Sequence, residues 1–119
     1  PAQSRLTMSG VVMGTIRYLP PERLRGGTST PAGDVYSVGV IFYEMVTGSK
    51  PFWSEATGEV LNCILKTYPL QPREISAEIP IELNSLIMAM LDKYPGLRPD
   101  LESLHMKLQL LAEKYPPQS

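Results

Sequence analysis

Side chains suited to covalent or metal chemistry are scarce in this sequence. Among its 119 residues there is one histidine, His105, and one cysteine, Cys63. Neither a Ser/His/Asp nor a Cys/His constellation can be assembled from so few groups, and a cysteine-rich zinc site is excluded. We therefore predict no metal site. We expect His105 to be a partly buried structural residue and Cys63 to be a small apolar filler.

The arginine-rich start of the chain offers a different chemistry. Residues 1–33 hold four arginines and one glutamate, which gives this stretch a charge of +3. Guanidinium groups bind phosphate bidentately. The stretch is either a phosphate receiver or an ordinary solvated loop, and charge alone favours the loop. The whole chain has 11 basic and 12 acidic residues, and this balance argues against a nucleic-acid partner.

Three strings of residues are more specific. The first, Gly-Thr-Ile-Arg-Tyr-Leu-Pro-Pro-Glu, occupies residues 14–22. The second runs from Asp-Val-Tyr-Ser-Val-Gly to Glu-Met-Val-Thr-Gly over residues 34–48, and Pro-Phe follows it. The third, Lys-Tyr-Pro-Gly-Leu-Arg-Pro, occupies residues 93–99. In this order they resemble three parts of the protein kinase family: the end of the activation segment, the central buried helix of the C-terminal lobe, and the Pro-x-x-Arg-Pro before the last helix.

The resemblance implies only part of a kinase. It makes residues 1–119 a partial kinase domain, with the activation segment at 1–22 and a helical C-lobe at 23–115. The chain contains no Gly-rich loop, strand lysine, His-Arg-Asp or Asp-Phe-Gly string, which a complete kinase carries. ATP and Mg²⁺ are thus the expected cofactors of the complete kinase. We expect this fragment to bind neither and to be inactive alone.

Two functions stay open on this basis. The first is a serine/threonine protein kinase that transfers the γ-phosphate of ATP to protein Ser/Thr, with this piece supplying the activation segment, the substrate-positioning loop and the helical base. Thr15 favours the serine/threonine branch, because tyrosine kinases usually place other residues there. The alternative is a pseudokinase or kinase-like scaffold that acts as a protein-binding module. The residues that touch ATP would discriminate the two, and they lie outside this chain.

Roles for individual residues follow from the resemblance. Thr15 and Asp34 would support the catalytic loop, the first through its hydroxyl and the second by capping backbone amides. Asp34 would also complement the helix dipole. The shelf that positions the substrate would include Met13, Gly14 and Leu19.

Two further sets of residues are implied by the resemblance. Thr7 and Ser9 precede Gly14 at positions where family members carry activating phosphorylation, and a phosphate there would pair with an arginine. Glu22 and Arg98 would form a structural ion pair, with a nitrogen of one within about 4 Å of an oxygen of the other. Both residues adjoin prolines, which stiffen the backbone that carries them.

The spacing of apolar residues, together with residues that start or end helices, predicts the helices that carry these side chains. Thr30 and Pro31 predict the start of a long helix that Gly48 ends. Its apolar residues lie all round the axis, so we expect it to be buried in the centre of the fold. Residues 67–79 should be irregular, and no strand is predicted. The expected fold is all-α, with helices at residues 20–25, 31–47, 55–66 and 81–93 and a last one from about residue 100.

Several expectations concern surroundings and partners. The longest apolar run is too short to span a bilayer, and no basic and apolar leader opens the chain, so we expect a cytoplasmic protein. The expected partners are a protein substrate and the missing N-lobe and catalytic loop of the same kinase. This chain is too short to cover its central helix on every side. Two copies could therefore form a homodimer or exchange their activation segments.

Overall fold

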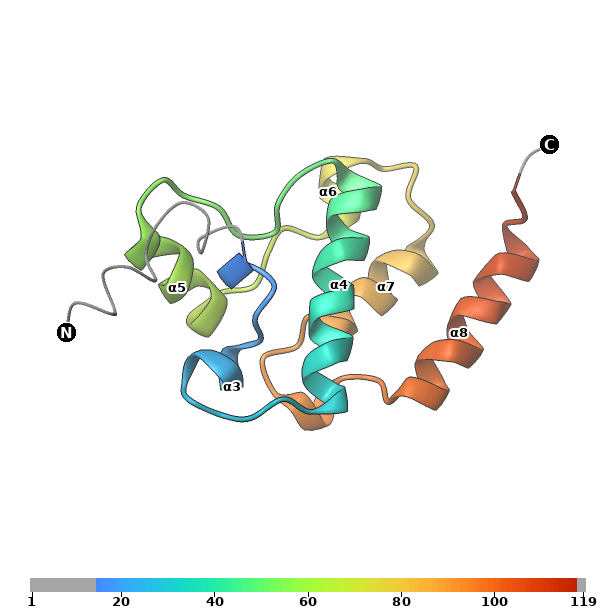
Figure 1. Cartoon of the computed structure of the whole chain (residues 1–119). Coiled ribbons are helices and arrows are strands. Elements are labelled where there is room, and N and C mark those ends of the chain that lie inside the picture. The colour runs from blue at the N-terminus through green and yellow to red at the C-terminus, as the bar shows by residue number, and fades with distance from the viewer. Residues whose placement is uncertain (1–14, 118–119) are drawn as a thin grey trace.

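A computed structural model describes residues 15–117 of the chain, and all the regular structure in this part is helical (Figure 1). In chain order the elements are α3 (Pro21–Leu24), α4 (Pro31–Thr47), α5 (Thr57–Lys66), α6 (Pro72–Ile75), α7 (Ile81–Met90), the 3-10 helix η1 (Pro95–Leu97) and α8 (Leu101–Lys114). Helix α4 stands in the middle, with α3 and α5 on one side of it and α7 and α8 on the other. The predicted all-α architecture around one central helix is confirmed.

The ends of α4 are set by the residues that the sequence pointed to. The Thr30 hydroxyl accepts a hydrogen bond from the backbone N–H of Gly33 at 3.0 Å, and Pro31 occupies the first turn. At the other end Gly48 adopts φ 71°, the left-handed conformation of a helix-ending glycine. These caps satisfy backbone groups that the helix itself leaves unpaired.

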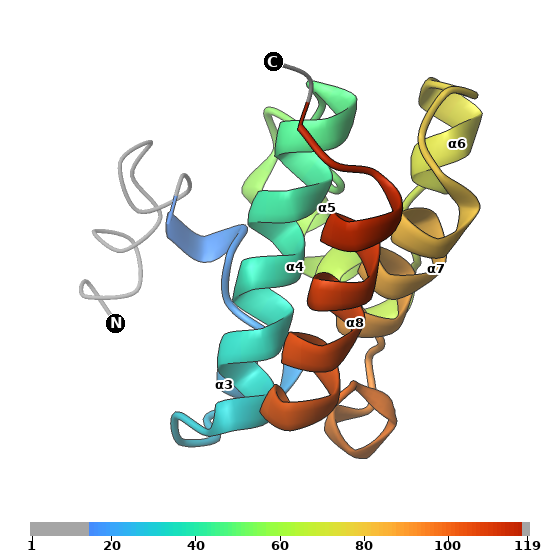
Figure 2. The same cartoon turned by 90° about the vertical axis from the view of Figure 1, so that its right-hand side faces the viewer.

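Helix α4 packs most extensively on α7, and a glycine allows the close approach. A Cβ built on Gly39 would lie 2.8 Å from Cβ of Met90 and 3.2 Å from Cδ2 of Leu91. No real Cβ tolerates such contacts, so only glycine fits at this crossing. Figure 2 shows α8 lying along the same side of the molecule, next to α4 and α7.

Three groups of buried apolar side chains hold the layers together. One lies between α5 and the start of the described chain: Ile16, Phe52, Val60 and Ile64. A second joins α4 to α7: Tyr36, Val40, Tyr43, Ile87 and Leu91. A third brings in α8: Val35, Leu86, Met90 and Leu104. The second and third groups therefore pack α4 against α7 and α8.

Lys93 links the α5 layer to the base of the fold. Its Nζ donates to the backbone oxygen of Cys63 at 3.3 Å and lies 4.5 Å from the ring centre of Phe52. Burial lowers the pKa of Lys93 to about 8. A partly desolvated cation over an aromatic face is an electrostatic contact as well as a packing one.

One face of α4 is left open by the residues that the structure describes. The helix is not buried all round by these residues, as expected for a chain too short to cover it: Ile41 is 44% exposed and Met45 is 74% exposed. Two layers of short helices cover only part of a 17-residue helix. The residues that the structure describes therefore cover only part of this helix.

Other sequence expectations need smaller corrections. A short helix, α6, forms inside the stretch expected to be irregular, because Pro72 opens it and the Glu74 carboxylate accepts from the backbone N–H of Gln71 at 2.6 Å. Helix α7 ends at Met90, three residues early, where the chain turns. His105 is exposed rather than partly buried. None of the helices in residues 15–117 has the length and apolar character needed to cross a membrane.

Candidate substrate-positioning site

The first described residues form a tight turn that leads into α3. The backbone N–H of Tyr18 donates to the oxygen of Thr15 at 3.1 Å, and the N–H of Leu19 donates to the oxygen of Ile16 at 2.9 Å. Ile16 is only 7% exposed, and Leu19 packs against the same apolar group beside α5. We call residues 15–19 the positioning turn.

A cluster of three polar side chains fastens the positioning turn to α4. Nε of Arg17 lies 2.9 Å from Oε2 of Glu44. The hydroxyl of Tyr18 accepts a hydrogen bond from Nη2 of Arg17 at 2.5 Å and donates to Oε1 of Glu44 at 3.0 Å. Both oxygens of the Glu44 carboxylate are thus engaged. We call these residues the Glu44 cluster.

The electrostatics of the Glu44 cluster follow from its contacts. The hydrogen bond to Glu44 raises the pKa of Arg17 above its ordinary value, against the smaller opposing effect of burial. Burial, together with the bond to Glu44, raises the pKa of Tyr18. Both side chains of the ion pair keep about a fifth of their surface exposed, 18% for Arg17 and 20% for Glu44. The cluster holds one positive and one negative charge in partial contact with solvent.

A serine on α4 adds a backbone contact to the positioning turn. The Ser37 hydroxyl lies 2.6 Å from the backbone oxygen of Tyr18 and 3.2 Å from that of Gly33, one turn earlier. A single hydroxyl proton can serve either oxygen. Side chains of α4 therefore contact both the main chain and the side chains of the positioning turn.

The second attachment joins α3 to the segment before α8. Nη1 of Arg98 lies 2.7 Å from Oε2 of Glu22, and Nη2 lies 2.8 Å from Oε1. This bidentate arrangement matches the geometry of guanidinium and carboxylate. Arg98 also donates to the backbone oxygens of Asp92 and Ala32, at 2.8 and 3.1 Å. We call this arrangement the Arg98 anchor.

Burial distinguishes the Arg98 anchor. The Arg98 side chain is 0% exposed and that of Glu22 is 23% exposed. Burial by itself raises the pKa of Glu22, but the hydrogen bonds from Arg98, a backbone hydrogen bond and the charges of Arg98 and Arg25 together outweigh it and hold that pKa below its ordinary value. The ionised carboxylate is thus the form that the fold favours.

Tyr36 lies against the Arg98 anchor and has an unusual hydroxyl. The Arg98 guanidinium carbon is 5.0 Å from the ring centre of Tyr36, close enough for a cation–π contact. The Tyr36 side chain is fully buried, and its hydroxyl has no hydrogen-bond partner in the described part of the chain. Burial strongly raises the pKa of Tyr36, so the hydroxyl stays protonated.

The structure places the residues predicted from sequence as follows. Glu22 and Arg98 meet within the expected distance. Thr15 and Asp34 are both exposed, at the start of the described chain and on the first turn of α4. Leu19 is half-buried beside α5. The remaining candidates, Thr7, Ser9, Met13 and Gly14, lie outside the described residues.

Sequence reasoning overlooked the Glu44 cluster. Its members were part of the quoted strings but had no assigned role. An arginine, a tyrosine and a glutamate are natural hydrogen-bond partners once the fold brings them together. Their separation of 26 or 27 positions follows no helical period, so only the fold reveals the contact.

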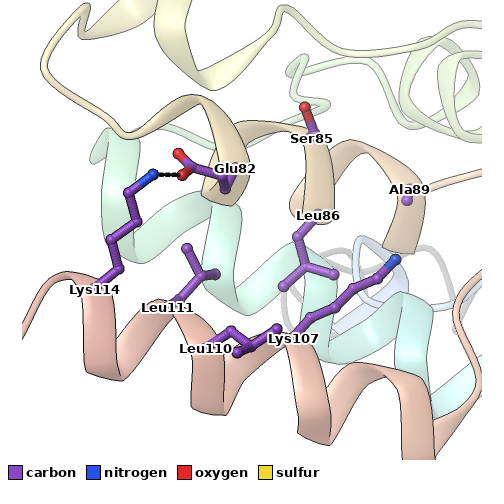
Figure 3. Close-up of a pocket in the computed structure, with 8 residues that line it drawn as sticks. All are labelled: Glu82, Ser85, Leu86, Ala89, Lys107, Leu110, Leu111 and Lys114. Carbon is purple, nitrogen blue, oxygen red and sulfur yellow. Dashed lines mark hydrogen bonds and ion pairs between the residues drawn. The ribbon is translucent and has the colours of Figure 1, made fainter.

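A groove on the other side of the molecule contains none of these residues. It lies between α7 and α8, has a volume of about 460 Å³ and has an apolar floor with lysines at its edges (Figure 3). Figure 3 shows Lys114 paired with Glu82 across one end. Among residues 15–117 there is no group of three or more histidine, cysteine or acidic side chains placed to hold a metal ion.

The fold and the Arg98 anchor together define the helical lower part of a protein kinase domain. The family model described as "Protein kinase domain" matches residues 3–109. This match covers most of the chain, and the chain belongs to the protein kinase family.

Known relatives point to one branch of that family. The chain is 34% identical over 116 residues to "Probable serine/threonine-protein kinase PkwA" of Thermomonospora curvata, and the aligned region covers 96% of this chain and 15% of that protein. It is 37% identical over 93 residues to "Serine/threonine-protein kinase PknA" of Mycobacterium tuberculosis, and the aligned region covers 78% of this chain and 21% of that protein. The chain thus spans less than a third of the length of these relatives.

A solved structure supports the fold independently. The twitchin kinase region from C. elegans superimposes with a TM-score of 0.69 at 24% identity, and the match covers 82% of this chain and 17% of that one. At this identity the likeness concerns the fold alone.

Proposed function

We propose that this chain is the activation segment, substrate-positioning loop and helical base of a serine/threonine protein kinase. The complete kinase would transfer the γ-phosphate of ATP to Ser or Thr of a protein substrate. The observation that carries the proposal is the Arg98 anchor, because it ties the end of the proposed activation segment to the helical base with two parallel hydrogen bonds. Relatives named as serine/threonine kinases support the same branch.

The roles of single residues belong to this proposal. Thr15 and Asp34 are exposed, as residues must be if they are to contact a catalytic loop from another part of the kinase. Leu19, with Met13 and Gly14, would form the shelf beside the phosphoacceptor. Phosphorylation at Thr7 or Ser9 would add charge that an arginine can pair with.

ATP and Mg²⁺ would be held by the rest of the kinase. The described residues contain no cluster of metal-ligating side chains, and the sequence has none of the strings that bind nucleotide. The residues of this chain therefore do not fit either group, and we assign them no step of phosphoryl transfer. The N-lobe and catalytic loop of the same kinase are the proposed partners, and the lone cysteine suits a reducing, cytoplasmic setting.

A phosphotransfer assay on the complete kinase tests the proposal. With Mg-ATP and a serine- or threonine-containing protein, we expect incorporation of phosphate, and Thr15→Ala should reduce the rate by about tenfold or more, equivalent to about 1.4 kcal/mol in the barrier. Thr15→Ser is the matched control, because it keeps the hydroxyl and should retain most of the rate. A folded complete protein that transfers no phosphate would contradict the proposal and favour a scaffold.

A further inference from the structure

The groove between α7 and α8 combines an apolar floor with charged ends (Figure 3). Its floor consists of Leu86 and Ala89 of α7 with Leu110 and Leu111 of α8, and we call it the α7–α8 groove. Leu110 keeps 59% of its surface exposed. Exposed apolar surface with polar residues at its rim is typical of a place where another molecule binds.

The two ends of the α7–α8 groove differ in charge. At one end Lys114 of α8 pairs with Glu82 of α7, so the charges at this end are balanced. At the other end Lys107 is exposed and extends toward Ala89 (Figure 3). Among residues 15–117 no acidic side chain forms an ion pair with Lys107. One positive charge at this end is therefore available to an acidic group of a partner.

The residues that line the α7–α8 groove recur at helical spacing. On α8, Lys107, Leu111 and Lys114 follow one another after four and three positions, and the lining residues of α7 have the same spacing. Seven positions correspond to two helical turns, or about 10 Å along each axis. A third helix that lies in such a groove meets these side chains with its own residues i, i+3 or i+4, and i+7. The spacing therefore favours a helix as the occupant.

Charge separates an acidic helix from two other occupants. Anionic membranes attract clusters of about four to eight lysines or arginines, whereas this groove has one lysine without an acidic partner. In a two-fold dimer the same surface would face itself. The groove has two lysines and one glutamate at its ends, so two positively charged surfaces would then meet. A helix with an acidic side chain meets neither difficulty.

We propose that the α7–α8 groove docks an acidic amphipathic helix of a protein partner. Apolar side chains of that helix pack on Leu86 and Leu110, and a glutamate or aspartate at one end of its apolar face pairs with Lys107. The groove contains no residue of the positioning turn or of the Arg98 anchor. Docking here is therefore separate from the positioning of a substrate and requires no phosphoryl transfer.

Binding of two fluorescent peptides to the complete kinase provides the test. Both peptides are alanine-rich and about 20 residues long, so that they form helices in isolation, and both have leucines at positions i, i+4 and i+7. One turn beyond the last leucine the acidic peptide has a glutamate, and the basic peptide has a lysine there. Fluorescence anisotropy without ATP gives both dissociation constants. The acidic peptide should bind about fivefold more tightly, as expected for one exposed ion pair.

Variants of the groove place the peptide at this surface. Lys107→Glu should invert the preference, so that the basic peptide binds about fivefold more tightly. Leu110→Gln should weaken both peptides about tenfold, because it removes apolar contact area. Lys66→Glu is the matched control, since it changes the net charge equally at the exposed end of α5. It should leave the preference within about twofold of wild type, because solvent and salt screen distant charges.

Docking of an acidic helix is overturned if neither peptide binds, or if Lys107→Glu changes the preference no more than Lys66→Glu does. Self-association of the wild-type kinase in analytical ultracentrifugation, lost in Leu110→Gln, would make a second copy the occupant instead. Sedimentation with phosphatidylglycerol vesicles, lost in Lys107→Glu, would make it a membrane. Should Leu110→Gln not fold, the exposed Lys107→Glu variant decides. Because ATP is absent, a kinase that transfers no phosphate contradicts only the proposed function.

Discussion

The segment from Arg17 to Glu22 is attached to the helical base at two places, and the two attachments differ mainly in burial. The Arg98 side chain is wholly removed from solvent and makes four hydrogen bonds. In the Glu44 cluster both charged side chains remain about a fifth exposed. A charge enclosed without its partner is very costly, whereas a charge near the surface can be solvated by water. The first attachment should therefore contribute more to the stability of the fold than the second.

The strongest way to break this comparison is to remove Arg98. Arg98→Leu removes four hydrogen bonds in a buried place and leaves two carbonyls, those of Asp92 and Ala32, as well as the Glu22 carboxylate without their donor. We therefore expect a loss of about 3–5 kcal/mol in the free energy of unfolding. Urea denaturation of the complete kinase domain measures it. Arg98→Lys is the control that keeps the charge and loses the fork, and its loss should be smaller. A loss below about 1 kcal/mol for Arg98→Leu would mean that the anchor behaves as a surface pair.

Acid should weaken the same attachment. The pKa of Glu22 is below its ordinary value of 4.5 in the folded state, because burial raises it less than the contacts with Arg98, a backbone hydrogen bond and the charge of Arg25 together lower it. The ionised group therefore stabilises the fold above pH 4.5, and this contribution disappears as the pH falls through the lower folded-state pKa. Unfolding free energies of wild type and Glu22→Gln should converge as the pH falls below that range. A constant difference at all pH values would contradict the assignment.

A smaller effect is expected at the Glu44 cluster. Arg17→Leu removes the ion pair and one hydrogen bond to Tyr18, yet the Tyr18 hydroxyl still donates to the remaining Glu44 carboxylate. We expect a loss of about 1 kcal/mol in the free energy of unfolding. Tyr18→Phe is the matched variant that keeps the ion pair and removes only the bridging hydroxyl. Loss in Arg17→Leu as large as in Arg98→Leu would remove the distinction between the two attachments.

The smallest effect on stability is expected for the most exposed ion pair. Lys114 and Glu82 pair across the groove of Figure 3, with side chains 61% and 39% exposed. Exposed pairs of this kind frequently contribute nothing measurable. Lys114→Gln should leave the denaturation midpoint of the kinase domain unchanged at physiological salt. A clear shift would show that burial is not what ranks these pairs.

Local signals predicted much of the fold, and they failed where distant groups decide the outcome. Thr30 and Gly48 set the ends of α4 as expected, because capping depends on neighbouring residues. The end of α7 at Met90 was missed, since Leu91 is apolar and continues the stripe, yet it packs fully buried against another layer. The periodic spacing of apolar residues predicts which side chains are buried, but it does not predict the residue at which a helix ends.

The same division applies to the candidate site. The Glu22–Arg98 contact was predicted from the resemblance, and no local pattern would have joined residues 76 positions apart. The Glu44 cluster was overlooked because the contacts of Glu44 depend on how the positioning turn lies on α4. The open face of α4 at Met45, among the residues that the structure describes, agrees with the expectation that so short a chain cannot cover its central helix on every side.

The central claim is that burial ranks the two attachments, and paired double-mutant cycles test it most directly. Unfolding free energies of the complete kinase domain are measured for Glu22→Gln, Arg98→Leu and their double variant, and for Glu44→Gln, Arg17→Leu and theirs. We predict a coupling energy of about 2–3 kcal/mol for Glu22 with Arg98 and about 0.5–1 kcal/mol for Arg17 with Glu44. Equal coupling energies, or a larger value for Arg17 with Glu44, would contradict the account.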